Sequence, residues 1–258
     1  MTGWRTQLTS WRLPVPDFPV VSAECALAIV DMQYMDAHPD YGLGKVFAAV
    51  DPDRAFYYFT RVRETVVPNI RRLLDTFRAD RLRVIYLTLG PVLADGSDLS
   101  PTFRRRYRLE EQSLGFRVTC PLGTPGHRIL EEIAPRPGEL VINKTANSAF
   151  NASDIDRILR NLEVQTLIVA GVGTDVCVET TARDAVDRGY NCIIVEDACA
   201  TLDEASHNAA LLAFAKWFGK VATTDELIAQ LRGDAASRAG EREGAASTES
   251  NNRVSEPL

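Results

Sequence analysis

Residues Thr166–Arg188, with the sequence TLIVAGVGTDVCVETTARDAVDR, contain the pattern that decides the fold of this chain. Thr166–Ala170 is rich in large and β-branched apolar residues, which predicts a fully buried strand. A Gly-Val-Gly turn interrupts this run, and Thr174 and Asp175, which follow it, are residue types that cap helix N-termini. From Val176 onward the apolar residues recur at helical spacing. The stretch therefore predicts a strand, a tight turn and a helix.

Cys177 falls in the first turn of this predicted helix. The free N–H groups and partial positive charge of a helix N-terminus favour a thiolate, lower the pKa of a cysteine and can hold an oxyanion. Two other interpretations stay open at this point. One is a cysteine buried in the core. The other is a phosphate-binding turn, although GVGTDV lacks the third glycine of a dinucleotide fingerprint and the lysine of a P-loop.

Strands and helices alternate along the chain, which predicts a parallel sheet covered by helices on both faces, an α/β fold. Besides 166–170 we expect strands at Cys25–Val30, Val84–Leu89, Leu140–Asn143, Asn191–Asp197 and Val221–Thr223. Besides the helix that starts near Cys177 we expect helices at Arg61–Arg78, Gly126–Ala134, Ile155–Leu162, Ser206–Phe218 and Asp225–Leu231. Pro68 lies within the first of these helices and is expected to kink it.

The domain is expected to cover residues 24–232, between two terminal segments. Residues 1–23 contain several prolines that exclude helix where they occur, so we expect an extended arm, whose tryptophans pack on its own domain or on a neighbouring subunit. Residues 233–258 have no aromatic residues and many small ones, which predicts disorder. Inside the domain, residues 36–53 and 90–125 resemble loops, and loops of such length often carry function. The arginines of the second loop are more often a solvated or intersubunit surface than an anion site.

Composition restricts the class of protein and its partners. The 258 residues have a formal net charge of −6 and a pI near 5.2, which argues against nucleic acid or an anionic membrane as a partner. We find no apolar run of membrane-spanning length and no apolar core of a secretory signal. The 5 cysteines form an odd set without paired spacing. We therefore expect a cytoplasmic chain with reduced thiols.

Three chemically useful side chains come directly after, or just beyond, predicted buried strands: Asp31, Lys144 and Cys177. Considered alone, Asp31 could cap a turn and Lys144 could be one more surface lysine. Because the carboxyl ends of parallel strands share one edge of the sheet, a carboxylate, an ammonium and a thiol can converge there in one pocket.

The chain resembles the isochorismatase-like cysteine hydrolase family. The matching motifs are IVDMQ around Asp31, VINKTANSAFNAS around Lys144 and VAGVGTDVCVETTARDA around Cys177, in the order of the family. The resemblance extends from about Ala23 to Leu231. It implies a six-stranded parallel sheet in a three-layer α/β/α sandwich, a Rossmann-like isochorismatase fold, assembled as a homodimer or homotetramer.

The resemblance also implies the roles of particular residues. Asp31, Lys144 and Cys177 would form the catalytic triad, with Cys177 as the nucleophile and Asp31 as the general base. Lys144 would help to lower the pKa of Cys177. A cis peptide bond would precede Gly173, and the N–H groups of Gly173 and Cys177 would form an oxyanion hole. Gly173 is itself a departure, because alanine or threonine is more usual at that position.

Other departures select a branch of the family. True isochorismatases cleave a vinyl ether and lack the cysteine, so Cys177 indicates amide chemistry. Nicotinamidases carry an Asp-x-His metal motif after the second strand, where this chain has Leu89-Gly90-Pro91-Val92, and we expect no metal and no cofactor. The metal-free amide branch remains, which comprises ureidoacrylate, N-carbamoylsarcosine, maleamate and biuret hydrolases.

The function expected from this resemblance is hydrolysis of the C–N bond of a small amide, ureide or carbamoyl compound through a thioester, with release of ammonia. Gln33, Tyr34 and Phe150 are candidates for the wall of the substrate pocket. We expect a small-molecule substrate as the partner, with neither nucleic acid nor membrane. Two alternatives stay open: a vinyl-ether hydrolase of the isochorismatase type, and a non-catalytic binding protein that kept the fold.

Overall fold

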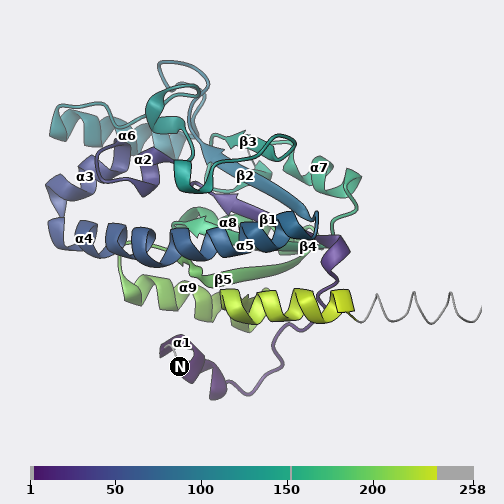
Figure 1. Ribbon diagram of the computed structural model, residues 1–258. Helices are drawn as coiled ribbons and strands as arrows, with labels where there is room; N and C mark the ends of the chain where they lie inside the picture. The colour runs from purple at the N-terminus through teal and green to yellow at the C-terminus, as the bar shows by residue number, and fades with distance from the viewer. Residues whose placement is uncertain (1–2, 152, 237–258) are drawn as a thin grey trace, which may run out of the picture.

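The computed structural model describes residues 3–151 and 153–236 and shows a parallel sheet between two layers of helices (Figure 1). The sheet of this part of the chain is six-stranded, in the order β3-β2-β1-β4-β5-β6, and every neighbouring pair is parallel. The strands are β1 (Cys25–Val30), β2 (Arg83–Leu89), β3 (Leu140–Lys144), β4 (Thr166–Val172), β5 (Asn191–Ala200) and β6 (Lys220–Ala222). The strand order reverses between β1 and β4, and ligands of such sheets bind at the carboxyl ends beside this switch point. The predicted fold class is confirmed.

The two central strands are buried along their whole length, as their continuous apolar sequences predict. Their register pairs Val30 of β1 with Gly171 of β4, so both strands end at the same level of the sheet. Gly171 has a φ of 122°, and a Cβ atom there would lie 2.1 Å from the carbonyl oxygen of Val30. The close approach of β1 and β4 therefore requires glycine at this position.

Helices cover both faces of the sheet (Figure 1). One hydrophobic cluster unites the sheet with α4 (Pro52–Arg61), the π-helical turn Val62–Val66, α5 (Val67–Ala79) and the helical residues 224–236. The cluster on the other face unites it with α1 (Gly3–Thr9), α7 (Ile155–Asn161), α8 (Glu179–Asp187) and α9 (Glu204–Trp217). The helix predicted around Pro68 is thus part of a longer helical run. Its π-helical turn ends at Val66, two residues before the proline, which lacks an N–H donor.

Both segments predicted as loops contain helices, and this part of the prediction is wrong. Residues 36–53 include the end of α2 (Tyr34–Ala37), α3 (Gly42–Val50) and the start of α4. Residues 90–125 include α6 (Pro101–Leu114), whose first turn is capped by the side chain of Ser100. The sequence of α6 is mostly polar, and its described buried side chains are only Phe103 and Tyr107, so its apolar stripe is too narrow to recognise.

The helix predicted at Gly126–Ala134 is also wrong. Two short 3₁₀ turns, Pro125–His127 and Glu131–Ile133, occupy this segment instead. Gln33, on the loop after β1, forms an isolated antiparallel bridge with Ile129 between the two turns. The Gln33 side chain also accepts a hydrogen bond from the Leu89 amide and donates to the carbonyls of Leu89 and His127. These contacts hold the segment in an extended path, because they satisfy its backbone without a helix.

Each terminal segment contains helical residues that the sequence analysis did not predict. Residues 1–23 are not extended throughout, because α1 forms before the first proline and Trp4 enters the core with 2% of its surface exposed. Trp4 thus packs on its own domain, one of the two expected places. Residues 233–236 continue the last helix, where the Asp234 carboxylate accepts hydrogen bonds from the Ser22 amide and hydroxyl groups. The rest of the segment predicted as disordered, 237–258, lies outside the described residues.

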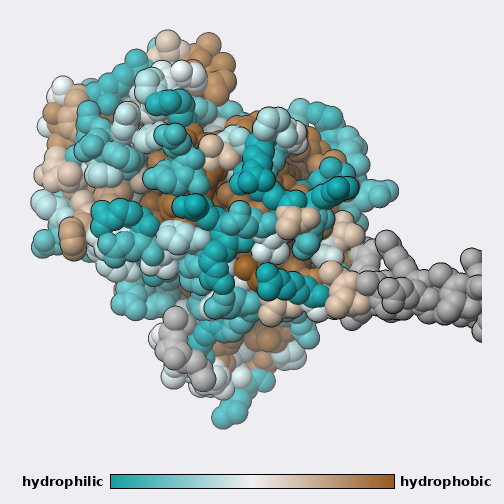
Figure 2. Space-filling model, in the orientation of Figure 1, coloured by the Kyte–Doolittle hydropathy of each residue, from teal (hydrophilic) through white to brown (hydrophobic). Residues whose placement is uncertain are grey.

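Hydrophilic and hydrophobic side chains are both present on the surface. Figure 2 shows one face on which hydrophilic side chains predominate and hydrophobic patches lie between them. Among residues 3–151 and 153–236, no helix has the length and apolar character that crossing a membrane requires.

Candidate active site

The three predicted triad residues come together at the carboxyl edge of the sheet. Asp31 directly follows β1, Lys144 is the last residue of β3, and Cys177 lies in the π-helical turn Thr174–Val178 after β4. Asp31 has a φ of 52°, a conformation that costs energy for any residue with a Cβ atom. Its amide donates a 2.8 Å hydrogen bond to the carbonyl of Leu87 in β2, which holds the backbone in this conformation.

Lys144 connects the other two side chains. Its Nζ donates a 2.8 Å hydrogen bond to Asp31 Oδ2 and lies 3.4 Å from Cys177 Sγ. The carbonyl of Ala146 accepts a further hydrogen bond of 3.2 Å from Nζ, and the side-chain oxygen of Asn147 lies 3.7 Å from Sγ. The other oxygen of Asp31, Oδ1, is buried and has no hydrogen-bond partner among the described residues. One carboxylate oxygen is therefore held by the lysine, and the other is free to accept a proton.

Burial dominates the electrostatics of the triad. Burial, then the neighbouring Asp31 carboxylate, raises the pKa of the Cys177 thiol well above its ordinary value, against the opposing effect of Lys144. Burial also raises the pKa of Asp31, and Lys144 again opposes it. For Lys144 burial disfavours the charge, but Asp31 and Cys177 outweigh this effect and raise its pKa.

These shifts correct one prediction. We expected the helix N-terminus and Lys144 to lower the pKa of Cys177. Lys144 does act in this direction, but burial and the Asp31 carboxylate outweigh it, so the pKa of the thiol rises. The sequence predicted a carboxylate near Cys177, but it did not show that the thiol would be only 5% exposed, and this burial is the largest cause of the rise. A neutral thiol needs a base to remove its proton during reaction, and the free oxygen of Asp31 lies on the carboxylate beside it.

The turn before Cys177 contains a cis peptide bond between Val172 and Gly173, as the family resemblance implied. The carbonyl oxygen of Gly173 accepts hydrogen bonds from the amides of Val176 and Val178, each at 3.1 Å. The turn is thus fixed by backbone contacts at the start of the helical segment that carries Cys177.

A small cavity of about 100 Å³ opens beside Asp31 and Cys177. Its wall is partly apolar, from Leu43, Phe47, Leu89, Phe103, Val172, Val176 and Leu202. Its polar lining beyond the triad comes from Asp36, Tyr58, Arg106, Tyr107 and Thr201. A cavity well below the usual 300–1,000 Å³ of ligand sites fits only a small substrate.

The predicted pocket-wall residues lie elsewhere. Among the described residues, those that line this cavity do not include Gln33, Tyr34 or Phe150. The Gln33 side chain bonds to backbone groups, as described above. Tyr34 packs against His38 and Tyr41, with ring centroids 5.5 and 5.3 Å away. Phe150 belongs to the same hydrophobic cluster as Cys177, but it packs beside Tyr190 and does not line the cavity.

Sequence reasoning missed the residues of α2 and α6 that line the cavity. Asp36 and Tyr107 are buried, and Arg106 lies beside them. Asp36 carried a signal, since it stands five residues after Asp31 in the segment beyond the carboxyl end of β1, where sites form. Arg106 and Tyr107 carried no sequence signal for a site, because an arginine-rich helix usually forms a solvated surface.

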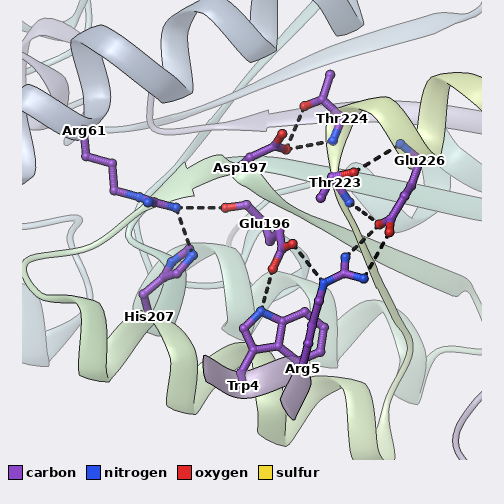
Figure 3. A network of polar contacts seen from close by, with 9 residues as sticks. All are labelled: Trp4, Arg5, Arg61, Glu196, Asp197, His207, Thr223, Thr224 and Glu226. Atoms are coloured by element: carbon purple, nitrogen blue, oxygen red, sulfur yellow. Dashed lines mark hydrogen bonds and ion pairs between the residues drawn. The ribbon is translucent and has the colours of Figure 1, made fainter. Parts of the chain in front are cut away.

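A second polar network, in which Figure 3 shows Arg61 and His207, reaches the turn before Cys177 through Thr174. Arg61 Nη2 lies 3.0 Å from His207 Nε2, and His207 Nδ1 lies 2.8 Å from Thr174 Oγ1. A guanidinium group can only donate, so Nε2 accepts from Arg61 and Nδ1 donates to Thr174. Burial, then the charge of Arg61, lowers the pKa of His207 to about 3, so the imidazole is neutral.

The same network reaches the N-terminal helix (Figure 3). Arg61 also donates to the carbonyl oxygen of Glu196, 3.1 Å away. The Glu196 carboxylate accepts a hydrogen bond from Trp4 Nε1 and pairs with Arg5 at 3.0 Å. Arg5 in turn pairs with Glu226. The network therefore ties α1, β5 and α9 to the turn that precedes Cys177.

Among residues 3–151 and 153–236 no group of three or more histidine, cysteine, aspartate or glutamate side chains could hold a metal ion.

Comparison with known proteins places the chain in a family. Residues 45–226 match the family model described as the isochorismatase domain. Ureidoacrylate amidohydrolase RutB from Rhizobium rhizogenes is 31% identical over 235 residues, which are 85% of this chain and 89% of that protein. RutB from Agrobacterium fabrum is 31% identical over 229 residues, which are 83% of this chain and 93% of the relative.

Solved structures agree with this match. A cysteine hydrolase from Pseudomonas syringae pv. phaseolicola superposes with a TM-score of 0.70 at 31% identity, covering 87% of this chain and 100% of the other. N-carbamoylsarcosine amidase from Thermoplasma acidophilum gives a TM-score of 0.53 at 26% identity, covering 79% of this chain and 98% of the other. The chain belongs to the isochorismatase family of hydrolases.

Proposed function

We propose that the protein is a cysteine-dependent amidohydrolase that cleaves the C–N bond of a small amide, ureide or carbamoyl compound and releases ammonia. The observation that carries the proposal is the buried contact of Lys144 Nζ with both Asp31 Oδ2 and Cys177 Sγ, at 2.8 and 3.4 Å. The names of the relatives support it, because they are an amidohydrolase, a cysteine hydrolase and an amidase.

The reaction begins with acylation of the cysteine. Asp31 takes the thiol proton as Cys177 Sγ attacks the substrate carbonyl carbon, which forms a C–S bond and a tetrahedral oxyanion. The oxyanion is stabilised by the N–H groups of Gly173 and Cys177, at the fixed turn before the helix. The C–N bond then breaks, and the nitrogen takes the proton from Asp31 and leaves as ammonia. A thioester on Cys177 remains.

Hydrolysis of the thioester completes the cycle. Asp31 removes a proton from a water molecule that attacks the thioester carbonyl. The C–S bond breaks, and the thiolate of Cys177 regains the proton from Asp31. Lys144 keeps its charge throughout, because its pKa is raised, and it stabilises each state in which Asp31 or Cys177 carries the negative charge.

The test is a panel of ureides, carbamoyl amino acids and primary amides, scored by ammonia release and by the mass of the protein. We expect ammonia from at least one member, and an acyl adduct on Cys177 when the reaction is quenched early. Asp31→Asn should block formation of the adduct. Pyruvate from isochorismate without ammonia from any amide would instead identify a vinyl-ether hydrolase, and no turnover of either class would indicate a binding protein.

A further inference from the structure

The cavity beside Cys177 contains buried polar atoms that the proposed reaction does not use. Asp36 is 7% exposed and Tyr107 is 2% exposed, and both line the cavity. Asp36 Oδ2 and the Tyr107 hydroxyl group are buried without a hydrogen-bond partner within 3–151 and 153–236. Such atoms cost a folded protein stability, so each needs an explanation. A substrate that binds in the cavity supplies the missing partner.

The Asp36 backbone and the Tyr107 ring are held in place by their surroundings. The carbonyl oxygen of Asp36 accepts a 2.9 Å hydrogen bond from the hydroxyl group of Tyr58, which also lines the cavity. The Tyr107 ring stacks on Phe103, with centroids 5.5 Å apart and an interplanar angle of 16°. Groups fixed in this way lose little conformational freedom when a ligand binds, so they are suited to recognise one.

The charges around the cavity leave Asp36 without a counter-ion. Lys144 pairs with Asp31 at 2.8 Å, and Arg106 pairs with Glu110 at 2.8 Å. No ion pair to Asp36 forms in the part of the chain that the structure describes. Burial, then the repulsion of Asp31, raises the pKa of Asp36 well above its ordinary value, against smaller opposing effects of Lys144 and Arg106.

The chemistry of Asp36 decides what it can accept. As a carboxylate it accepts hydrogen bonds with both oxygens, and as a carboxylic acid it still accepts with one. An N–H donor of the substrate is therefore bound in either protonation state. A substrate carboxylate would instead offer Asp36 and Tyr107 no N–H donor, and its charge would be buried beside the acidic groups of Asp31 and Asp36, which disfavours its binding.

On the basis of the proposed amide hydrolysis, we propose that Asp36 and Tyr107 recognise a second polar group of the substrate, and that this group is an uncharged N–H donor such as an amide or ureide nitrogen. The substrate is then a small neutral compound with two amide-type groups, one attacked by Cys177 and one held by Asp36 and Tyr107. Ureidoacrylate, the compound in the names of the relatives, is a carboxylate and should be a poor substrate.

The test compares matched substrates. From the best substrate of the ammonia-release panel, two compounds are made that share the scissile group and differ only in the remaining polar group, which is an amide in one and a carboxylate in the other. We expect wild-type kcat/KM to favour the amide member by at least about tenfold, because the carboxylate member leaves the buried polar atoms of Asp36 and Tyr107 without an N–H donor.

Single substitutions test whether Asp36 and Tyr107 cause the preference for the amide member. Asp36→Asn replaces an acceptor oxygen with an N–H donor, which opposes the N–H group of the amide member and can bind the carboxylate member, so it should lower the preference at least about tenfold. Tyr107→Phe should lower kcat/KM for the amide member without improving the carboxylate member. Asp40→Asn makes the same chemical change at an exposed site four residues away and should keep the wild-type preference, because its side chain is 80% exposed.

The preference is a ratio within one protein sample, so a loss of folded protein does not change it. A wild-type ratio near one, or in favour of the carboxylate, would overturn the proposal, as would an Asp36→Asn variant with the wild-type ratio. If Asp36→Asn does not fold, the wild-type ratio and Tyr107→Phe still decide. Hydrolysis of amides without the preference refutes this inference alone, whereas no hydrolysis of any amide refutes the proposed function and this inference with it.

Discussion

Replacement of His207 should change how the stability of the protein depends on pH. His207 is buried and its pKa is lowered from 6.5 to about 3, by burial first and by Arg61 second. In the unfolded chain the imidazole takes up a proton below about pH 6.5, whereas in the folded protein it stays neutral down to much lower pH. Acid therefore favours the unfolded state. The stability that the neutral histidine contributes is complete above pH 6.5 and is lost as the pH falls toward 3.

The magnitude follows from the same two values. Each pH unit below the unfolded pKa costs about 1.4 kcal/mol while the folded form remains unprotonated. Between about pH 7.5 and about pH 5 the wild type should therefore lose about 2 kcal/mol of unfolding free energy through His207. His207→Gln keeps an acceptor for Arg61 but does not titrate, so it should not show this loss.

The assay is urea unfolding of both proteins at the two pH values, at one protein concentration so that any association contributes equally. The quantity compared is the change in unfolding free energy with pH, which cancels the packing cost of the substitution. His38→Gln is the control for removing a histidine at any position, because the His38 side chain is 36% exposed and lies outside the network of His207. If wild type and His207→Gln lose the same free energy between the two pH values, His207 is not held neutral and the network in Figure 3 is wrong.

The remaining predictions concern the triad, Asp36 and the N-terminal helix. Cys177→Ser should turn over at least ~10³-fold slower, a loss of about 4 kcal/mol in the barrier, and near-normal turnover would exclude Cys177 as the nucleophile. Lys144→Met should move iodoacetamide labelling of Cys177 to higher pH, because Lys144 opposes the rise in the pKa of Cys177; coincident labelling curves would contradict the contact. Asp36→Asn should raise Tm increasingly as the pH rises above about 4, because the raised pKa of Asp36 destabilises the wild type only where the unfolded chain ionises; a pH-independent difference would count against this. Trp4→Ala should cost about 3–5 kcal/mol in urea unfolding, as for other buried tryptophans, and a negligible loss would show that α1 does not contribute to the core.

The fold and the meeting of the triad were predictable from the sequence for one physical reason. Buried parallel strands need continuous apolar sequences, so β1 and β4 could be recognised without their partners. Residues that follow such strands lie at one edge of the sheet, which brought Asp31, Lys144 and Cys177 together in the prediction as in the structure.

What depends on contacts between distant segments was decided only by the tertiary structure. Helix α6 buries few of its residues, so its pattern carried no clear period. Gln33 was predicted to face the substrate, yet its amide bonds to backbone groups of Leu89 and His127, which are far away in sequence. The pKa of Cys177 was predicted to fall because a helix N-terminus favours a thiolate. It rises because burial and the Asp31 carboxylate act more strongly, and both come from elements that assemble around the thiol only in the folded chain.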